Sequence, residues 1–133
     1  MIAVVCVDDR GGMTFNHRRV SRDKGLIADL LALRGEAALY IHPYSLPLFG
    51  GAEKVIASED FLDLAGEGDV CFVENVPLTD AQERIERLIV YRWNRDYPAD
   101  TYLDVDLEAF RLEASTDFAG SSHDPITREE YTR

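Results

Sequence analysis

Short apolar runs separated by polar segments recur along the chain and predict buried β-strands. The first run, residues 2–7, is continuous, apolar and β-branched, and it ends at two aspartates, which is typical of a central strand covered on both faces. Other runs of strand length follow at residues 37–41, 54–57, 69–74, 88–93 and around 110–115. The pattern predicts a sheet with the first strand in its middle.

Apolar residues at helical spacing lie between these runs. Ser21 is placed to cap a helix that ends at Gly35 and carries Leu26, Ile27, Leu30, Leu31 and Leu33. The stretch 42–47 allows little more than one helical turn because of Pro47. Alternating strands and helices imply parallel strands, and the strand-rich C-terminus indicates an antiparallel edge. We therefore expect an α/β fold, a single three-layer domain over residues 1–133 with a mixed, mostly parallel sheet and an antiparallel C-terminal edge.

Three further segments carry weaker patterns. Residues 11–20 have no periodicity, which predicts a mobile loop that joins the first strand to the first helix over a site. The spacing of Thr79 and Gln82 predicts a capping box for a short helix. Thr127 and Glu130 have the same spacing and predict one last helical turn.

The composition limits the classes of protein to consider. With 133 residues and 46% apolar composition, the chain can bury one core of ordinary size. No stretch approaches the ~20 apolar residues of a membrane-spanning helix. Because two aspartates follow the first apolar run and no cationic segment precedes it, we expect no secretory signal and a cytoplasmic protein. Cys6 and Cys71 lie in separate apolar runs, which indicates small core residues rather than disulfide, metal or redox chemistry.

The charge is strongly acidic but unevenly placed. Lys and Arg total 14 against 25 Asp and Glu, and the net charge of -11 disfavours nucleic-acid binding. Residues 17–24 differ, because one acid, Asp23, stands there among Arg18, Arg19, Arg22 and Lys24. This run is the surface best able to attract an anion. A solvated loop that balances nearby carboxylates is the alternative.

Motifs near both ends of the chain carry a family resemblance. The N-terminal motifs are Val7-Asp8-Asp9 and Gly11-Gly12-Met13. The C-terminal motifs are Arg87-Leu88-Ile89-Val90-Tyr91, Ala99-Asp100-Thr101-Tyr102, Phe110-Arg111-Leu112 and Asp117-Phe118. Together they resemble the first strand, the late strand, the following turn and the final hairpin of dihydrofolate reductases. The resemblance implies the fold of that family for nearly the whole chain.

The resemblance also implies a role for Asp23. This residue falls where the family has the acid that hydrogen-bonds the pterin ring, so Asp23 is the candidate catalytic residue. The alternative is an acid in the first turn of a helix, where the helix dipole stabilises a carboxylate.

The chain departs from the family where the family binds its cofactor. His42-Pro43-Tyr44-Ser45 stands in place of a Gly-Arg-Lys/His-Thr motif whose arginine helps to hold a cofactor phosphate. Glu74-Asn75 stands in place of a Gly-Gly pair that lets the pyrophosphate approach the backbone. A carboxylate there would repel a pyrophosphate. We therefore expect no cofactor, and NADPH stays possible only in another mode of binding.

Metal chemistry has no support in the histidine pattern. Short proteins of this kind can carry a ribonuclease Z label, but the zinc sites of that enzyme need a His-x-His-x-Asp-His cluster. The three histidines here are isolated at positions 17, 42 and 123, so we expect no metal site.

These patterns favour a non-enzymatic dihydrofolate reductase-like domain that binds an unknown, anionic small molecule or a protein. Its expected ligand site comprises Asn16, His17, Arg18, Arg19, His42, Tyr44, Ser45, Glu74 and Asn75. One alternative is a divergent NAD(P)H-dependent reductase of a pterin-like heterocycle, with Asp23 as the substrate-orienting acid. Another is a structural homodimer, because the shortened middle of the chain leaves a sheet edge that needs covering.

Overall fold

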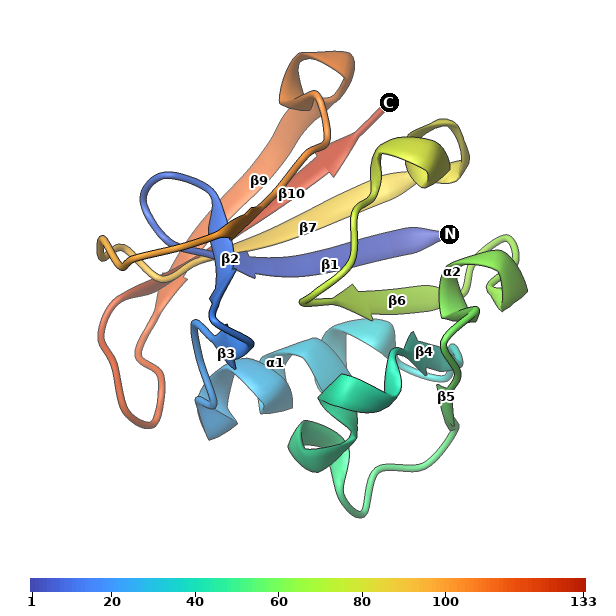
Figure 1. Cartoon of the computed structure of the whole chain (residues 1–133), viewed down its shortest axis with the longest axis horizontal. Coiled ribbons are helices and arrows are strands. Elements are labelled where there is room, and N and C mark those ends of the chain that lie inside the picture. Colours follow the sequence, from blue (N-terminus) through green and yellow to red (C-terminus); the bar gives the residue numbers. More distant parts are fainter.

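A seven-stranded sheet forms the centre of the computed structural model, which describes residues 1–133 (Figure 1). The strand order is β5-β4-β6-β1-β7-β10-β9. The strands are β1 (Ile2–Val7), β4 (Leu39–Ile41), β5 (Val55–Ala57), β6 (Val70–Val73), β7 (Arg87–Arg92), β9 (Arg111–Phe118) and β10 (Ile126–Thr132). The central place of β1 is confirmed. The antiparallel C-terminal edge is confirmed too, since β10 runs antiparallel to both β7 and β9.

Side chains of the sheet alternate between two cores. On one face Ala3, Val5 and Val7 pack with residues of α2 (Phe61–Leu64) and of the 3-10 helix η2 (Thr79–Arg84). On the other face Val4 and Cys6 pack with α1 (Lys24–Arg34) and the 3-10 helix η1 (Pro43–Phe49). A third 3-10 helix, η3 (Leu107–Ala109), precedes β9. The predicted three-layer α/β domain is confirmed, because helices cover both faces of the sheet.

A small second sheet replaces the irregular loop predicted for residues 11–20. It has the order β3-β2-β8, with β2 at Gly12–Phe15, β3 at Arg18–Arg19 and β8 at Thr101–Tyr102. Asn16 and His17 form the tight turn of the β2–β3 hairpin and have φ of 50° and 64°. Such left-handed pairs connect hairpin strands whose twist they match. The prediction of a segment without regular structure is therefore wrong.

Two predicted helix caps and one predicted helical turn are also wrong, although a short helix, η2, does begin at Thr79. The N-cap of α1 is Asp23 and not Ser21, whose hydroxyl accepts a hydrogen bond from the Asp23 amide instead. Thr79 and Gln82 form no capping box, because the Thr79 hydroxyl donates to Asp104. Residues 126–132, expected to hold a helical turn, form strand β10. Gly35 ends α1 as predicted.

The β10 strand escaped prediction because three charged residues, Arg128 to Glu130, separate its buried side chains, Ile126 and Tyr131. Arg128 on β10 donates to both carboxylate oxygens of Asp29 on α1, at 2.7 and 2.8 Å. On the opposite face of the sheet Glu129 pairs with Arg92 of β7 at 2.5 Å. Ion pairs across the sheet thus replace the apolar alternation by which a half-buried strand is read.

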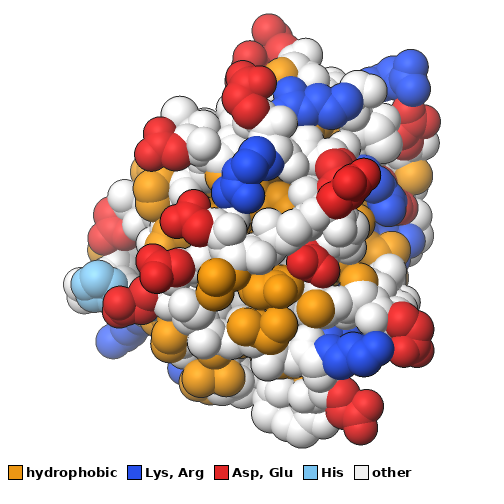
Figure 2. Space-filling view, turned by 90° about the vertical axis from the view of Figure 1, so that its right-hand side faces the viewer, with side chains coloured by type: hydrophobic (Ala, Val, Ile, Leu, Met, Phe, Trp, Pro, Cys, Tyr) orange, Lys and Arg blue, Asp and Glu red, His pale blue; other side chains and the backbone are white.

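The cysteines, the helix lengths and the surface agree with this layered fold. Cys6 and Cys71 are buried free thiols, so their predicted place in the core is confirmed. The longest helix, α1, has 11 residues, and no helix is long and apolar enough to cross a bilayer. Figure 2 shows one face of the molecule, on which hydrophobic side chains gather near the middle and charged side chains surround them.

Candidate functional site

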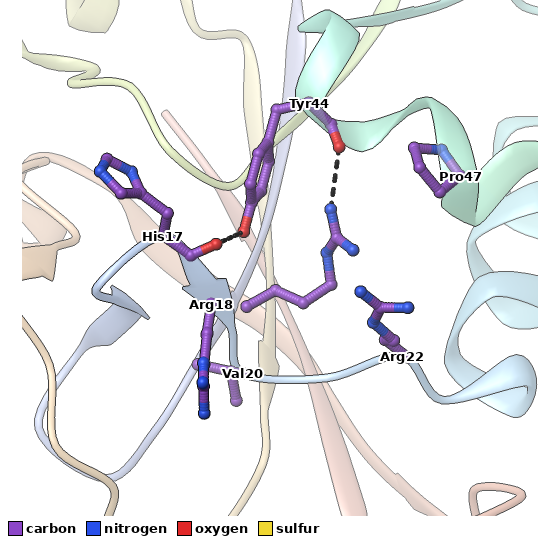
Figure 3. Close-up of a pocket in the computed structure, with 7 residues that line it drawn as sticks. His17, Arg18, Val20, Arg22, Tyr44 and Pro47 are labelled. Carbon is purple, nitrogen blue, oxygen red and sulfur yellow. Dashed lines mark hydrogen bonds between the residues drawn. The ribbon is translucent and has the colours of Figure 1, made fainter.

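A basic cavity lies where the β2–β3 hairpin and the approach to α1 meet η1. Its volume is about 600 Å³, and the residues that line it are His17, Arg18, Arg19, Val20, Arg22, Tyr44 and Pro47. Figure 3 shows these side chains around the opening. The cavity combines two segments that lie far apart in the sequence, and both belonged to the predicted ligand site. A cavity of this size falls within the range of about 300–1,000 Å³ that is typical of small-molecule sites.

A buried ion pair holds Arg19, one of the residues that line the cavity. Arg19 Nε donates to Glu74 Oε2 at 2.9 Å, and both side chains are only 6% exposed. The Ser45 hydroxyl donates to the other carboxylate oxygen, Glu74 Oε1, at 2.7 Å. Burial raises the pKa of Glu74, while the hydrogen bond from Ser45 and the charge of Arg19 oppose that shift. Glu74, which directly follows β6, is thus a buried carboxylate with a partner on each oxygen, and its place in a ligand site stays a prediction.

Tyr44 joins the hairpin to η1. Its hydroxyl donates to the His17 carbonyl at 2.5 Å, and its own carbonyl accepts from Arg19 Nη2 at 2.9 Å (Figure 3). The Arg19 guanidinium also lies 4.6 Å from the centre of the Tyr44 ring, which is a cation–π contact. Burial raises the pKa of Tyr44. These contacts hold the two walls of the cavity at a fixed separation.

Of the three arginines that line the cavity, Arg18 and Arg22 are unpaired, whereas Arg19 is not. Neither Arg18 nor Arg22 forms an ion pair or a side-chain hydrogen bond, whereas the charge of Arg19 is spent on Glu74. The expectation that Arg19 attracts an anion therefore needs correction. Arg22 also borders an adjoining cavity of about 210 Å³ with Lys24, so the cationic surface continues along the start of α1.

Asp23, the candidate catalytic residue, lies outside this cavity. Its buried carboxylate accepts four hydrogen bonds, from the Leu26, Ser121 and Ser122 amides and from the Ser122 hydroxyl, at 2.8–3.0 Å. Burial raises the pKa of Asp23, but these hydrogen bonds outweigh burial and hold it well below its usual range. The geometry favours the helix cap, and a catalytic role of Asp23 stays a prediction.

Besides Ser45 and Glu74, which lie behind Arg19, three other predicted site residues do not line the cavity. The Asn16 amide donates to Asp100 at the turn of the hairpin, at 3.0 Å. His42 caps η1, since its Nδ1 accepts from the Tyr44 amide at 3.0 Å. Asn75 follows β6, and its buried Oδ1 has no hydrogen-bond partner. Asn16 and His42 make contacts within the fold, and the Asn75 side chain makes no hydrogen bond. The place of all three in a ligand site stays a prediction.

Sequence reasoning missed three residues that line the cavity. Val20, Arg22 and Pro47 were not among the predicted site residues. Arg22 belongs to the cationic run 17–24, but its side chain was not predicted to line the ligand site. Pro47 was read as a helix breaker, but it lies inside η1. No group of three or more His, Cys, Asp or Glu side chains is arranged to hold a metal ion.

Comparisons with known proteins agree with the fold and go no further. No family model matches the chain, and no curated protein matches it in sequence. Among solved structures it is similar to a dihydrofolate reductase from Enterococcus faecalis, which was determined in complex with NADP(H) and RAB-propyl. The TM-score is 0.72 at 11% identity, over 99% of this chain and 95% of that one. The chain has a dihydrofolate reductase-like fold.

Proposed function

We propose that the protein binds a small anionic ligand in the basic cavity and does not bind NADPH in the manner of dihydrofolate reductases. The observation that carries the proposal is the cationic surface of Arg18, Arg22 and Lys24, whose side chains form no ion pair in a protein of net charge -11. Clefts lined by one sign of charge concentrate ligands of the opposite sign. An anion would therefore be drawn to this one part of an otherwise repelling surface.

The surroundings of Glu74 support the second half of the proposal. The family resemblance places Glu74-Asn75 where reductases have a Gly-Gly pair that approaches the cofactor pyrophosphate. Glu74 is only 6% exposed and is bound to both Arg19 and Ser45, so its side chain cannot move aside without breaking a buried ion pair. His42 and Tyr44 likewise make contacts of their own where the reductases have a phosphate-binding arginine. These residues do not fit a cofactor bound in the standard way.

Thermal unfolding of the purified protein with a panel of ligands tests the proposal. The panel contains pyrophosphate, ribose 5-phosphate, NADPH, NADH, dihydrofolate and methotrexate. A ligand at a hundred times its dissociation constant adds about 2.7 kcal/mol to stability, which is easily measured as a rise in melting temperature. We expect a rise with ribose 5-phosphate and pyrophosphate. Arg22→Gln should remove it, because Arg22 borders both basic cavities.

The control is Arg111→Gln, which removes the same charge from an exposed position on β9. It should keep the response to both anions. The proposal is wrong if no anion raises the melting temperature, or if Arg111→Gln reduces the response as much as Arg22→Gln does. A rise with NADPH or methotrexate that Asp23→Asn removes would instead favour the divergent reductase.

A structural homodimer is the second candidate, and the edge strand β5 favours it. Ile56 on β5 and Leu64 on α2 are 38% and 54% exposed, at one end of the sheet order. Exposed edge strands are common sites of pairing between chains. Light scattering at rising protein concentration tests this candidate. A mass that stays at 15.0 kDa throughout would remove its support.

A further inference from the structure

Another cavity, separate from the adjoining one that Lys24 borders, lies beside the β2–β3 hairpin and shares a wall with the basic cavity. Its volume is about 220 Å³, and it is lined by Phe15, Arg18, Arg19, Val20, Tyr97 and Pro98. The shared wall is residues 18–20, which border both cavities. Because small-molecule sites typically span about 300–1,000 Å³, this cavity fits one ring of a ligand rather than a whole ligand.

The register of the hairpin explains how the two cavities divide its side chains. Phe15 is paired with Arg18, and Thr14 is paired with Arg19. Directly paired residues of an antiparallel ladder lie on the same face. Thr14 and Arg19 point inward, while Phe15 and Arg18 point outward. Figure 3 agrees, since the Arg18 side chain points away from Tyr44.

Two aromatic side chains are exposed in this cavity without a partner to cover them. Phe15 is 46% exposed and Tyr97 is 39% exposed. Aromatic faces beside a guanidinium form a surface on which the ring of a nucleobase stacks. The exposed aromatic rings could hold a base, and the unpaired arginines beside them could hold an anionic group.

We propose that the Phe15–Tyr97 cavity binds the base of a nucleoside monophosphate whose phosphate lies in the basic cavity near Arg22. This inference rests on the proposed anion site and names the class of its ligand. Arg18 borders both cavities and carries no ion pair, so its guanidinium is available to the phosphate or to the base. A phosphate suits a site with several arginines, because guanidinium groups bind its oxygens in pairs.

The protein contains a natural reporter of this cavity. Trp93 is its single tryptophan, and Trp93 Nε1 donates to the Tyr97 hydroxyl at 3.0 Å. The Trp93 ring is buried and stacks on His123, with 4.3 Å between ring centres. A base that stacks on Tyr97 would alter the surroundings of the indole. Intrinsic fluorescence therefore reports binding in this cavity without a label.

Fluorescence and calorimetric titrations with adenosine 5′-monophosphate, ribose 5-phosphate and adenosine test the proposal. Base stacking on an aromatic side chain should make the monophosphate bind about 5- to 100-fold more tightly than ribose 5-phosphate. Phe15→Leu, which keeps the apolar bulk but removes the aromatic plane, should reduce that ratio toward one. Tyr102→Leu is the control, because Tyr102 is an exposed aromatic residue that borders neither cavity.

The outcomes separate this inference from the anion site on which it rests. Equal affinity for the monophosphate and ribose 5-phosphate would overturn the base-binding cavity and leave the anion site in place. No binding of any of the three would overturn both. Loss of the affinity ratio in Tyr102→Leu as well as in Phe15→Leu would also count against the cavity.

Discussion

Replacing Asp23 by asparagine should destabilise the fold, because the carboxylate joins the start of α1 to the loop before β10. Leu26 and Ser121 donate their amides to Oδ1, while the Ser122 amide and hydroxyl donate to Oδ2. An asparagine side chain has one acceptor oxygen and one donor group. In either orientation its NH2 group faces at least one backbone amide that then has no side-chain acceptor.

The expected cost follows from the number of hydrogen bonds lost. A hydrogen bond to a charged group contributes about 1.5–3 kcal/mol, and a buried amide left without a partner costs a similar amount. The Ser122 hydroxyl can rotate and accept from the new amide, so one backbone bond is the minimum loss. We therefore expect Asp23→Asn to lower the free energy of unfolding by about 1.5–3 kcal/mol, and Asp23→Ala to lower it by more.

Urea unfolding followed by Trp93 fluorescence measures this cost. With a dependence of about 1–3 kcal/mol per molar urea, the expected loss moves the midpoint by about 1 M. Asp60→Asn is the matched control, because Asp60 is the N-cap of α2 but its side chain makes no capping hydrogen bond. It should change stability by less than about 0.5 kcal/mol.

The pH dependence provides an independent check. The pKa of Asp23 is held below its usual range in the folded protein, so its contribution is present above the unfolded value of about 3.9. The contribution is lost as pH falls through the lower, folded pKa. The stability difference between the wild type and Asp23→Asn should thus be constant at neutral pH and shrink below about pH 4.

One result would refute this reasoning. If Asp23→Asn were as stable as Asp60→Asn at neutral pH, the four hydrogen bonds would not support the fold. The Asp23 carboxylate would then be available for chemistry, as the family resemblance implies.

Three further predictions concern the interior. Arg19→Met should cost about 3–5 kcal/mol at pH 7 in urea unfolding, because the buried Glu74 carboxylate loses its cation, and the cost should fall in acid as Glu74 takes up a proton. Gly120→Ala should cost about 1–3 kcal/mol in the same assay, because a Cβ there would clash with Asp23 Oδ2 and with the Ile126 side chain. Burial raises the pKa of Cys71 to about 12, so its thiol should not react with a disulfide reagent until the protein is unfolded.

Each of these predictions has a clear contrary result. A pH-independent cost for Arg19→Met would show that the cost comes from lost packing and not from the unpaired charge of the buried Glu74. An unchanged urea midpoint for Gly120→Ala would mean that the loop can move away from Asp23. Rapid modification of Cys71 in the native protein would place its thiol at the surface.

The sequence predicted the segments that form the candidate site but not the contacts of each side chain. The cationic run 17–24 and the stretch 42–47 were both recognised from sequence, and the structure brings them together around one cavity. The sequence did not show which arginine of the run is paired inside the fold and which is left unpaired. Arg19 turns inward because Glu74, 55 residues away in the chain, supplies a buried carboxylate. Arg22 has no such partner and stays available to a ligand.

The sequence by itself determined the elements whose side chains follow a local period. Apolar runs specified the central strand β1 and its parallel neighbours, and helical spacing with Gly35 specified α1. These features depend on residues a few positions apart. The long-range structure decided the rest. It placed strand β10, whose middle residues are charged and held by ion pairs, and it joined Asp23 to a distant loop. Ion pairs and hydrogen bonds between distant segments have no period, so only the folded chain shows which groups are satisfied and which remain free to bind.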